Sequence, residues 1–124
     1  MAEVWVVNAS PLIVLDRLGQ LDLLARLGHA LVVPGGVLVE ISRGPRPIAP
    51  SRLGAFRTAT VEVIDPVVAG WDLGRGESEV LTCAASEHAD VVVLGAGLAG
   101  LRGRALMDTG VDVVGLEAGV APSA

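Results

Sequence analysis

The sequence predicts a single three-layer α/β/α domain built around a central parallel sheet of four or five strands. Two observations predict this fold class. Apolar, strand-like stretches alternate along the chain with stretches of helical spacing, an order typical of βαβ units. In addition, 52% of the 124 residues are hydrophobic, which fits a sheet buried on both faces. We expect one domain over residues 1–124, in which residues 118–124 form a loose tail.

Short apolar runs predict the strands, which are Glu3–Val7, Ala30–Val33, Thr60–Ile64, Asp90–Leu94 and Val111–Leu116. Helical spacing predicts helices at Pro11–Leu18, Gln20–Leu27, Gly35–Ser42, Ser51–Arg57, Gly76–His88 and Leu98–Met107. Ser10 is expected to cap the first helix, with Pro11 in its first helical position. Asn8 therefore falls where the first strand ends, at the sheet edge where parallel α/β folds bind ligands.

Composition narrows the classes of protein. No apolar run approaches the roughly 18 residues that span a bilayer, and the start has no signal-peptide pattern. Cys83 is the single cysteine, so a disulfide within the chain and a cysteine metal cluster are excluded. We expect a cytoplasmic protein without a membrane segment.

The charge balance argues against a broadly basic nucleic-acid-binding surface, because the net charge is −5. All nine basic residues are arginines. A short proline-interrupted stretch contains four of them, Arg43, Arg46, Arg52 and Arg57. This stretch is either a local patch that meets phosphates or an ordinary solvated surface.

Two glutamates occupy positions of interest on predicted helices. The buried face of the Gly76–His88 helix is marked by Val80, Leu81, Ala84 and Ala85. Glu77 precedes these residues at helical spacings and shares their face. A buried acid must be paired, capped or metal-bound; the alternative is a first-turn carboxylate favoured by the helix dipole. Glu40, three residues after Val37, gives a weaker signal and fits a half-exposed edge position equally well.

Three motifs together resemble those of PIN-domain ribonucleases. The opening VVNASPLI resembles the (D/N)xSPLI motif and places Asn8 where most PIN domains have a metal-binding Asp. PGGVLVEI resembles the second motif, whose Glu is Glu40, and LGRGESEVLTCA resembles the third, whose Glu is Glu77. The motifs occur in the family's order and cover about residues 4–94.

This resemblance implies a PIN-like fold and metal-assisted hydrolysis of RNA. Asn8, Glu40 and Glu77 are then the catalytic and metal-binding positions for Mg²⁺ or Mn²⁺, and Ser10 supports Asn8. Hard cations prefer carboxylate oxygens, and they activate water and neutralise phosphate charge. The resemblance also implies a VapC-like toxin that an antitoxin protein neutralises. The two leucine-rich predicted helices are apolar on more than one face, which indicates a partner surface. PIN toxins commonly form dimers, so the resemblance supports the prediction of a homodimer.

The chain departs from the family pattern at the fourth acidic motif. There the family strand ends in an Asp or an Asp pair, whereas Asp90–Leu94 is followed by a glycine-rich turn. The nearest acids in sequence are Asp90, Asp108 and Asp112. We expect all three to lie about 10 Å or more from this edge, because they sit before a strand or late in a helix. We therefore expect weak metal binding and weakened or lost activity, and the alternative is an inactive PIN scaffold that acts through protein contacts.

The segment in place of the fourth motif resembles the dinucleotide fingerprint of flavin-dependent amine oxidases. Gly95, Gly97 and Gly100 follow a strand with G-x-G-x-x-G spacing, and Glu117 ends the next predicted strand. Such glycines let backbone approach a pyrophosphate, and such a Glu accepts from ribose hydroxyls. A nucleotide-binding module is thus a third hypothesis. Its alternative is chance composition in a chain rich in glycine and alanine.

Overall fold

The computed structural model describes residues 3–27, 30–45, 47–95 and 112–116. In these ranges five strands form one parallel sheet in the order β3-β2-β1-β4-β5. The strands are β1 (Val4–Val7), β2 (Ala30–Pro34), β3 (Phe56–Ala59), β4 (Val91–Gly95) and β5 (Asp112–Leu116). The predicted class, an α/β domain with a central parallel sheet, is confirmed.

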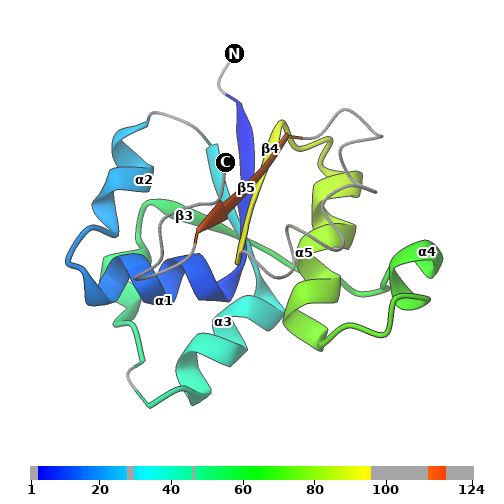
Figure 1. Cartoon of the computed structure of the whole chain (residues 1–124), viewed down its shortest axis with the longest axis horizontal. Helices are drawn as coiled ribbons and strands as arrows, with labels where there is room; N and C mark the ends of the chain where they lie inside the picture. The colour runs from blue at the N-terminus through cyan, green and yellow to red at the C-terminus, as the bar shows by residue number, and fades with distance from the viewer. Residues whose placement is uncertain (1–2, 28–29, 46, 96–111, 117–124) are drawn as a thin grey trace.

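Helices cover both faces of this sheet. They are α1 (Ala9–Arg17), α2 (Asp22–Arg26), α3 (Gly35–Arg43), α4 (Pro66–Ala69) and α5 (Arg75–Ser86), with a short 3₁₀ helix, η1 (Pro50–Leu53). Figure 1 shows α1 and α2 on one side of the strands, α5 on the other, and α3 below the sheet. The chain moves in one direction across the sheet from β1 to β3 and then returns to β4 on the other side of β1. Because crossovers between parallel strands are right-handed, this change of direction puts the later helices on the opposite face of the sheet. No helix in the described ranges is long and apolar enough to cross a membrane.

The core lies along the three middle strands. Val6 of β1 pairs with Val32 of β2 on one side and with Val92 of β4 on the other, and all three are fully buried. Leu12 of α1 and Leu81 of α5 are also fully buried. Because both faces are covered, the strands are continuous apolar runs without a polar alternation. Because β1 is held in this packed core, the position of Asn8 at its carboxyl end is fixed as well.

The strand order reverses between β1 and β4, which is where open α/β sheets form a binding crevice. Asn8 follows β1 directly and lies beside β4. Its backbone N–H donates to the carbonyl oxygen of Val93, with 3.0 Å between N and O. Asn8 is thereby held at the reversal point.

Two predicted elements differ from the structure. The predicted strand Thr60–Ile64 is wrong, because the edge strand is Phe56–Ala59. The predicted helix Ser51–Arg57 is reduced to the 3₁₀ turn η1. Register explains the shift, since β2 pairs from Leu31 to Pro34 with residues 56–59 and offers no partner further on. The predicted helix Leu98–Met107 lies outside the described residues.

Helix α4 was not expected from the sequence, although its signals are present. Asp65 is its N-cap, and a carboxylate oxygen of Asp65 accepts from the N–H of Val67 at 2.8 Å. Pro66 fills the first helical position. This short turn leads the chain from β3 to the start of α5.

Candidate functional site

Asn8 is a buried polar residue with an unused oxygen. It is only 3% exposed, and it occupies the N-cap position of α1 with extended backbone. Its side chain makes no capping hydrogen bond, and its Oδ1 has no hydrogen-bond partner among the described residues. A buried acceptor without a donor costs about 1–3 kcal/mol. Since no described residue satisfies this oxygen, it is a candidate ligand atom.

Ser10 does not have the position expected for it. The helix begins at Ala9, so Asn8 is the N-cap and exposed Ser10 is the second helical residue. The strand β1 runs into the helix with one residue between them, which leaves no room for a cap at position 10. The prediction that Ser10 caps α1 is wrong.

The structure brings Glu40 and Glu77 together. Partial desolvation of the Glu40 carboxyl and the nearby charge of Glu77 raise the pKa of Glu40, and a hydrogen bond from the Gly76 backbone opposes them. Glu40 lies on the exposed side of α3, and Glu77 is half-buried in the first turn of α5. A Cβ atom on Gly76 would collide with Oε1 of Glu40, so the start of α5 and Glu40 are in close approach.

Three helices begin at this edge of the sheet. Figure 1 shows the first turns of α1, α3 and α5 near one another below the strands, and α3 packs against both other helices. Helix N-termini carry partial positive charge, which stabilises carboxylates. Asn8, Glu40 and Glu77 thus all belong to elements that meet here.

The donor set is small. Within the described ranges, no group of three or more His, Cys, Asp or Glu side chains could hold a metal ion. Two carboxylates and one amide oxygen remain, and these oxygen ligands suit a hard divalent cation. A cation beside Glu40 would offset the charge of Glu77, which raises the pKa of Glu40.

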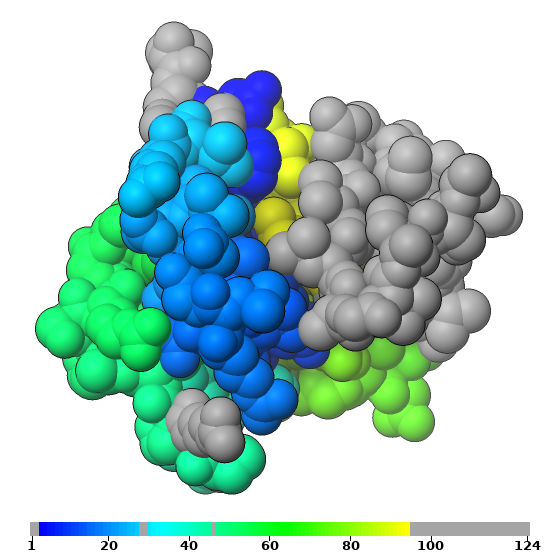
Figure 2. Space-filling model, turned by 60° about the vertical axis from the view of Figure 1, so that its left-hand side comes forward, coloured from blue at the N-terminus to red at the C-terminus, as the bar shows by residue number. Residues whose placement is uncertain are grey.

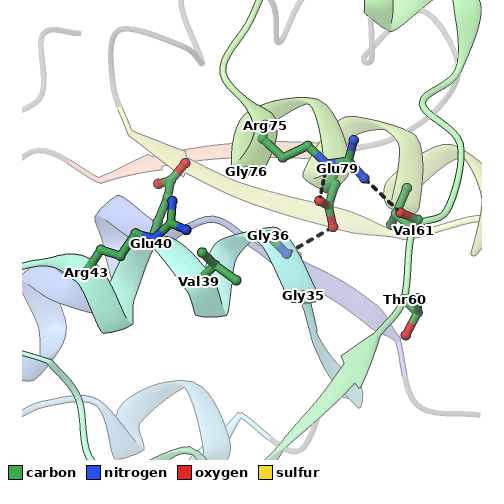
Figure 3. Close-up of a pocket in the computed structure, with 10 residues that line it drawn as sticks. All are labelled: Gly35, Gly36, Val39, Glu40, Arg43, Thr60, Val61, Arg75, Gly76 and Glu79. Atoms are coloured by element: carbon green, nitrogen blue, oxygen red, sulfur yellow. Dashed lines mark hydrogen bonds and ion pairs between the residues drawn. The ribbon is translucent and has the colours of Figure 1, made fainter.

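Glu79 is a site residue that the sequence reasoning missed. It is 4% exposed and therefore more buried than Glu77. Its Oε2 lies 2.6 Å from Nε of Arg75, and its Oε1 accepts from the N–H of Gly36 at 3.0 Å (Figure 3). The Arg–Glu spacing of four residues was the available signal. The buried face of α5 is accordingly rotated from the predicted one, and Ala85 is exposed.

The glycine fingerprint is described only at its first residue. Gly95 ends β4 and pairs with Leu116 of β5. Gly97, Gly100 and Glu117 lie outside the described residues. The structure therefore adds nothing to the nucleotide-binding hypothesis.

A parallel α/β sheet that carries, at the reversal of its strand order, a buried amide oxygen without a partner among the described residues belongs to the class of open α/β domains that bind ligands at this edge. A family model described as a PIN domain, DUF3368, matches residues 4–115, and the chain belongs to this PIN-domain family. Searches of curated proteins and of solved structures gave no significant match. Membership indicates a nuclease-type function that depends on a divalent metal.

Proposed function

We propose that the protein is a PIN-type endoribonuclease of weakened activity, with a loosely bound Mg²⁺ or Mn²⁺ ion at Asn8, Glu40 and Glu77. One observation carries the proposal: the buried Oδ1 of Asn8 has no partner among the described residues and lies at the reversal of strand order. A purely structural Asn at a helix start would use that oxygen as a cap.

Each residue has a distinct part in the proposed chemistry. A bound divalent cation supplies water activation and neutralises charge on the phosphate. Asn8 contributes a neutral oxygen on a rigid support, whereas Glu40 and Glu77 contribute negative charge. A carboxyl group binds a cation in its deprotonated form, which the burial of Glu40 and the charge of Glu77 both oppose. Cation binding should therefore strengthen as the pH rises through the pKa of Glu40.

The loss of an acid after β4 explains why the activity should be weak. The strand ends at Gly95, which has no side chain to bind metal. Hard-cation sites gain affinity from their carboxylates, and this one has two. We expect a dissociation constant in the millimolar range, so micromolar Mg²⁺ binding by calorimetry would reveal a ligand missing from this set.

The test is restoration of the lost acids. Asn8→Asp and Gly95→Asp, singly and together, should raise Mn²⁺-dependent cleavage of a labelled RNA, and Glu77→Gln should remove it. Thermal melting of each variant controls for folding. If no variant cleaves RNA while all remain folded, the protein is instead an inactive scaffold that acts through protein contacts.

We further propose that the protein is a cytoplasmic, VapC-like toxin component that forms a homodimer and is neutralised by an antitoxin. Exposed leucines on the α1–α2 side support a partner surface, namely Leu18, Leu23 and Leu27. Figure 2 shows these two helices as one continuous surface. Sedimentation should give a dimer at micromolar concentration, and a stable monomer would contradict it. Co-purification with a small DNA-binding protein encoded by a neighbouring gene tests the toxin role.

A further inference from the structure

A cavity of about 570 Å³ opens beside Glu40, between the starts of α3 and α5 and the segment that follows β3. Figure 3 shows its lining. Its size falls within the range of about 300–1,000 Å³ that is typical of small-ligand pockets. Because Glu40 belongs both to its wall and to the proposed metal site, a ligand in the cavity would lie beside that site.

Among the described residues that line this cavity, Arg43 is the cation that no other side chain holds. Of the two arginines in the lining, Arg75 is held by Glu79 and by the carbonyl oxygen of Val61. Arg43 is exposed and makes no ion pair with any residue in the described ranges. It follows Glu40 by three residues on α3, and Figure 3 shows both side chains on the same side of the helix.

The other described arginines of the proline-interrupted stretch are not free in the same sense to bind a phosphate. Arg52 pairs with Asp16, and Arg57 pairs with Glu87 at 2.9 Å. Arg46 lies outside the described residues. The broad basic patch considered from the sequence is therefore reduced, within the described part of the chain, to Arg43.

The rest of the lining suits a nucleoside. Val39 is 45% exposed although it is apolar, and it lines the cavity together with half-buried Val61. These side chains offer an apolar surface to a base, and exposed Thr60 offers a hydroxyl. An unpaired base can enter such a pocket, whereas a base stacked in a duplex cannot.

We infer that this cavity binds one unpaired nucleotide of single-stranded RNA beside the cleaved phosphodiester, and that Arg43 is the positioning residue that contacts its phosphate. The inference rests on the proposed ribonuclease function and adds a nucleotide site beside the proposed metal positions and the residue that contacts the phosphate of that nucleotide.

The first experiment measures binding without catalysis. Fluorescence anisotropy with a labelled single-stranded RNA 12-mer, in EDTA, compares Arg43→Gln with Arg17→Gln at several salt concentrations. Arg17 is a matched control because it is exposed, ends α1 and has no ion pair in the described ranges. Loss of one phosphate contact should weaken binding by about five- to tenfold and reduce the salt slope by about 0.7. The control should change affinity less than twofold.

A second pair of variants tests the cavity itself. Thr60→Trp fills it, whereas Val63→Trp places the same side chain on a highly exposed position outside it. Only Thr60→Trp should weaken RNA binding, and the 12-mer annealed to its complement should bind more weakly than the free strand. Unchanged melting temperatures show that each variant is folded.

The outcomes separate this inference from the proposed function. Equal effects of Arg43→Gln and Arg17→Gln, or equal binding of duplex and single strand, overturn the inference even if the protein cleaves RNA. Binding that depends on Arg43 without metal-dependent cleavage supports the inference and overturns the ribonuclease proposal. If the wild-type protein neither binds nor cleaves the 12-mer, both are overturned.

Discussion

Glu79 on α5 accepts a hydrogen bond from the backbone N–H of Gly36 on α3, with 3.0 Å between the two atoms. N–H groups in the first turn of a helix have no acceptor within that helix. For Gly36 of α3, the acceptor is a carboxylate of α5. Arg75 balances the charge of the buried carboxylate. This connection fixes how α3, which carries Glu40, sits against α5, which carries Glu77.

Removal of the Glu79 carboxylate should destabilise the fold. Glu79→Ala leaves the Gly36 N–H without its acceptor, and we expect a loss of about 2 kcal/mol in the free energy of unfolding, measured by urea denaturation. Glu87→Ala is the matched control, because the Glu87 ion pair with Arg57 is more exposed and should contribute less than about 1 kcal/mol. Equal losses of stability for the two variants would show that the Glu79–Gly36 hydrogen bond contributes no more than an exposed ion pair.

Two glycines in equivalent helix positions should respond differently to the same substitution. Gly36 and Gly76 are each the second residue of their helix, and a Cβ on either would meet a glutamate carboxyl group. Glu79 is buried and paired, so Gly36→Ala should cost about 1–3 kcal/mol in stability. Glu40 is exposed and can move away, so Gly76→Ala should change stability by less than about 0.5 kcal/mol.

The same pair separates stability from function. Gly76→Ala displaces Glu40 and should abolish Mn²⁺-dependent RNA cleavage while its urea midpoint stays near that of the wild type. A Gly76→Ala variant that retains full activity would remove Glu40 from the proposed site.

The raised pKa of Glu40 means that the ionised Glu40 carboxylate destabilises the fold at neutral pH. The folded protein binds the Glu40 proton more tightly than the unfolded chain does, so the stabilisation is present below the ordinary pKa of 4.5. It is lost as the pH rises through the folded-state value.

Glu40→Gln should therefore be more stable than the wild type at pH 7, by about 0.5 kcal/mol for an exposed charge pair, and equal to it near pH 3. Urea denaturation in EDTA at both pH values measures this difference. Glu62→Gln removes the same charge from the exposed segment after β3 and should show no such gain. A Glu40→Gln variant that is less stable at pH 7 would show that Glu40 has a stabilising partner.

The Cys83 thiol should be inert in the folded protein. Burial, with a smaller effect of the Glu87 charge, raises its pKa to about 11. The thiolate is the reactive form, so alkylation by iodoacetamide at pH 8 should be slow and should become rapid in urea. Mass spectrometry of the intact chain follows the reaction, and fast native labelling would mean that this part of α5 opens readily.

The sequence predicted the buried strands well and the edge strand poorly. Continuous apolar runs identify β1, β2 and β4 because burial on both faces demands them. The Thr60–Ile64 stretch has the alternation typical of a strand, yet no strand forms there. At the edge of a sheet, register with the one neighbour decides which residues pair, and β2 ends at Pro34. Local pattern carries no information on that register.

The candidate site shows a similar division. The motif spacing predicted Glu40 and Glu77 as site residues, and they are close enough that the charge of Glu77 raises the pKa of Glu40. The unpartnered oxygen of Asn8 and the role of Glu79 could not be inferred, because both depend on packing between helices far apart in sequence. The four-residue spacing from Arg75 to Glu79 indicated a pair but not that Glu79 would be buried.

The central place of β1 also has a consequence for how the protein is made. This strand leaves the ribosome early, and β2 follows at Ala30, but β4 begins 84 residues after Val7. At about 5 to 20 residues per second, synthesis of that interval takes roughly 4 to 17 s. Until then Asn8 lacks the neighbouring strand whose carbonyl oxygen holds it. The proposed metal position of Asn8 is therefore completed only after β4 has been synthesised.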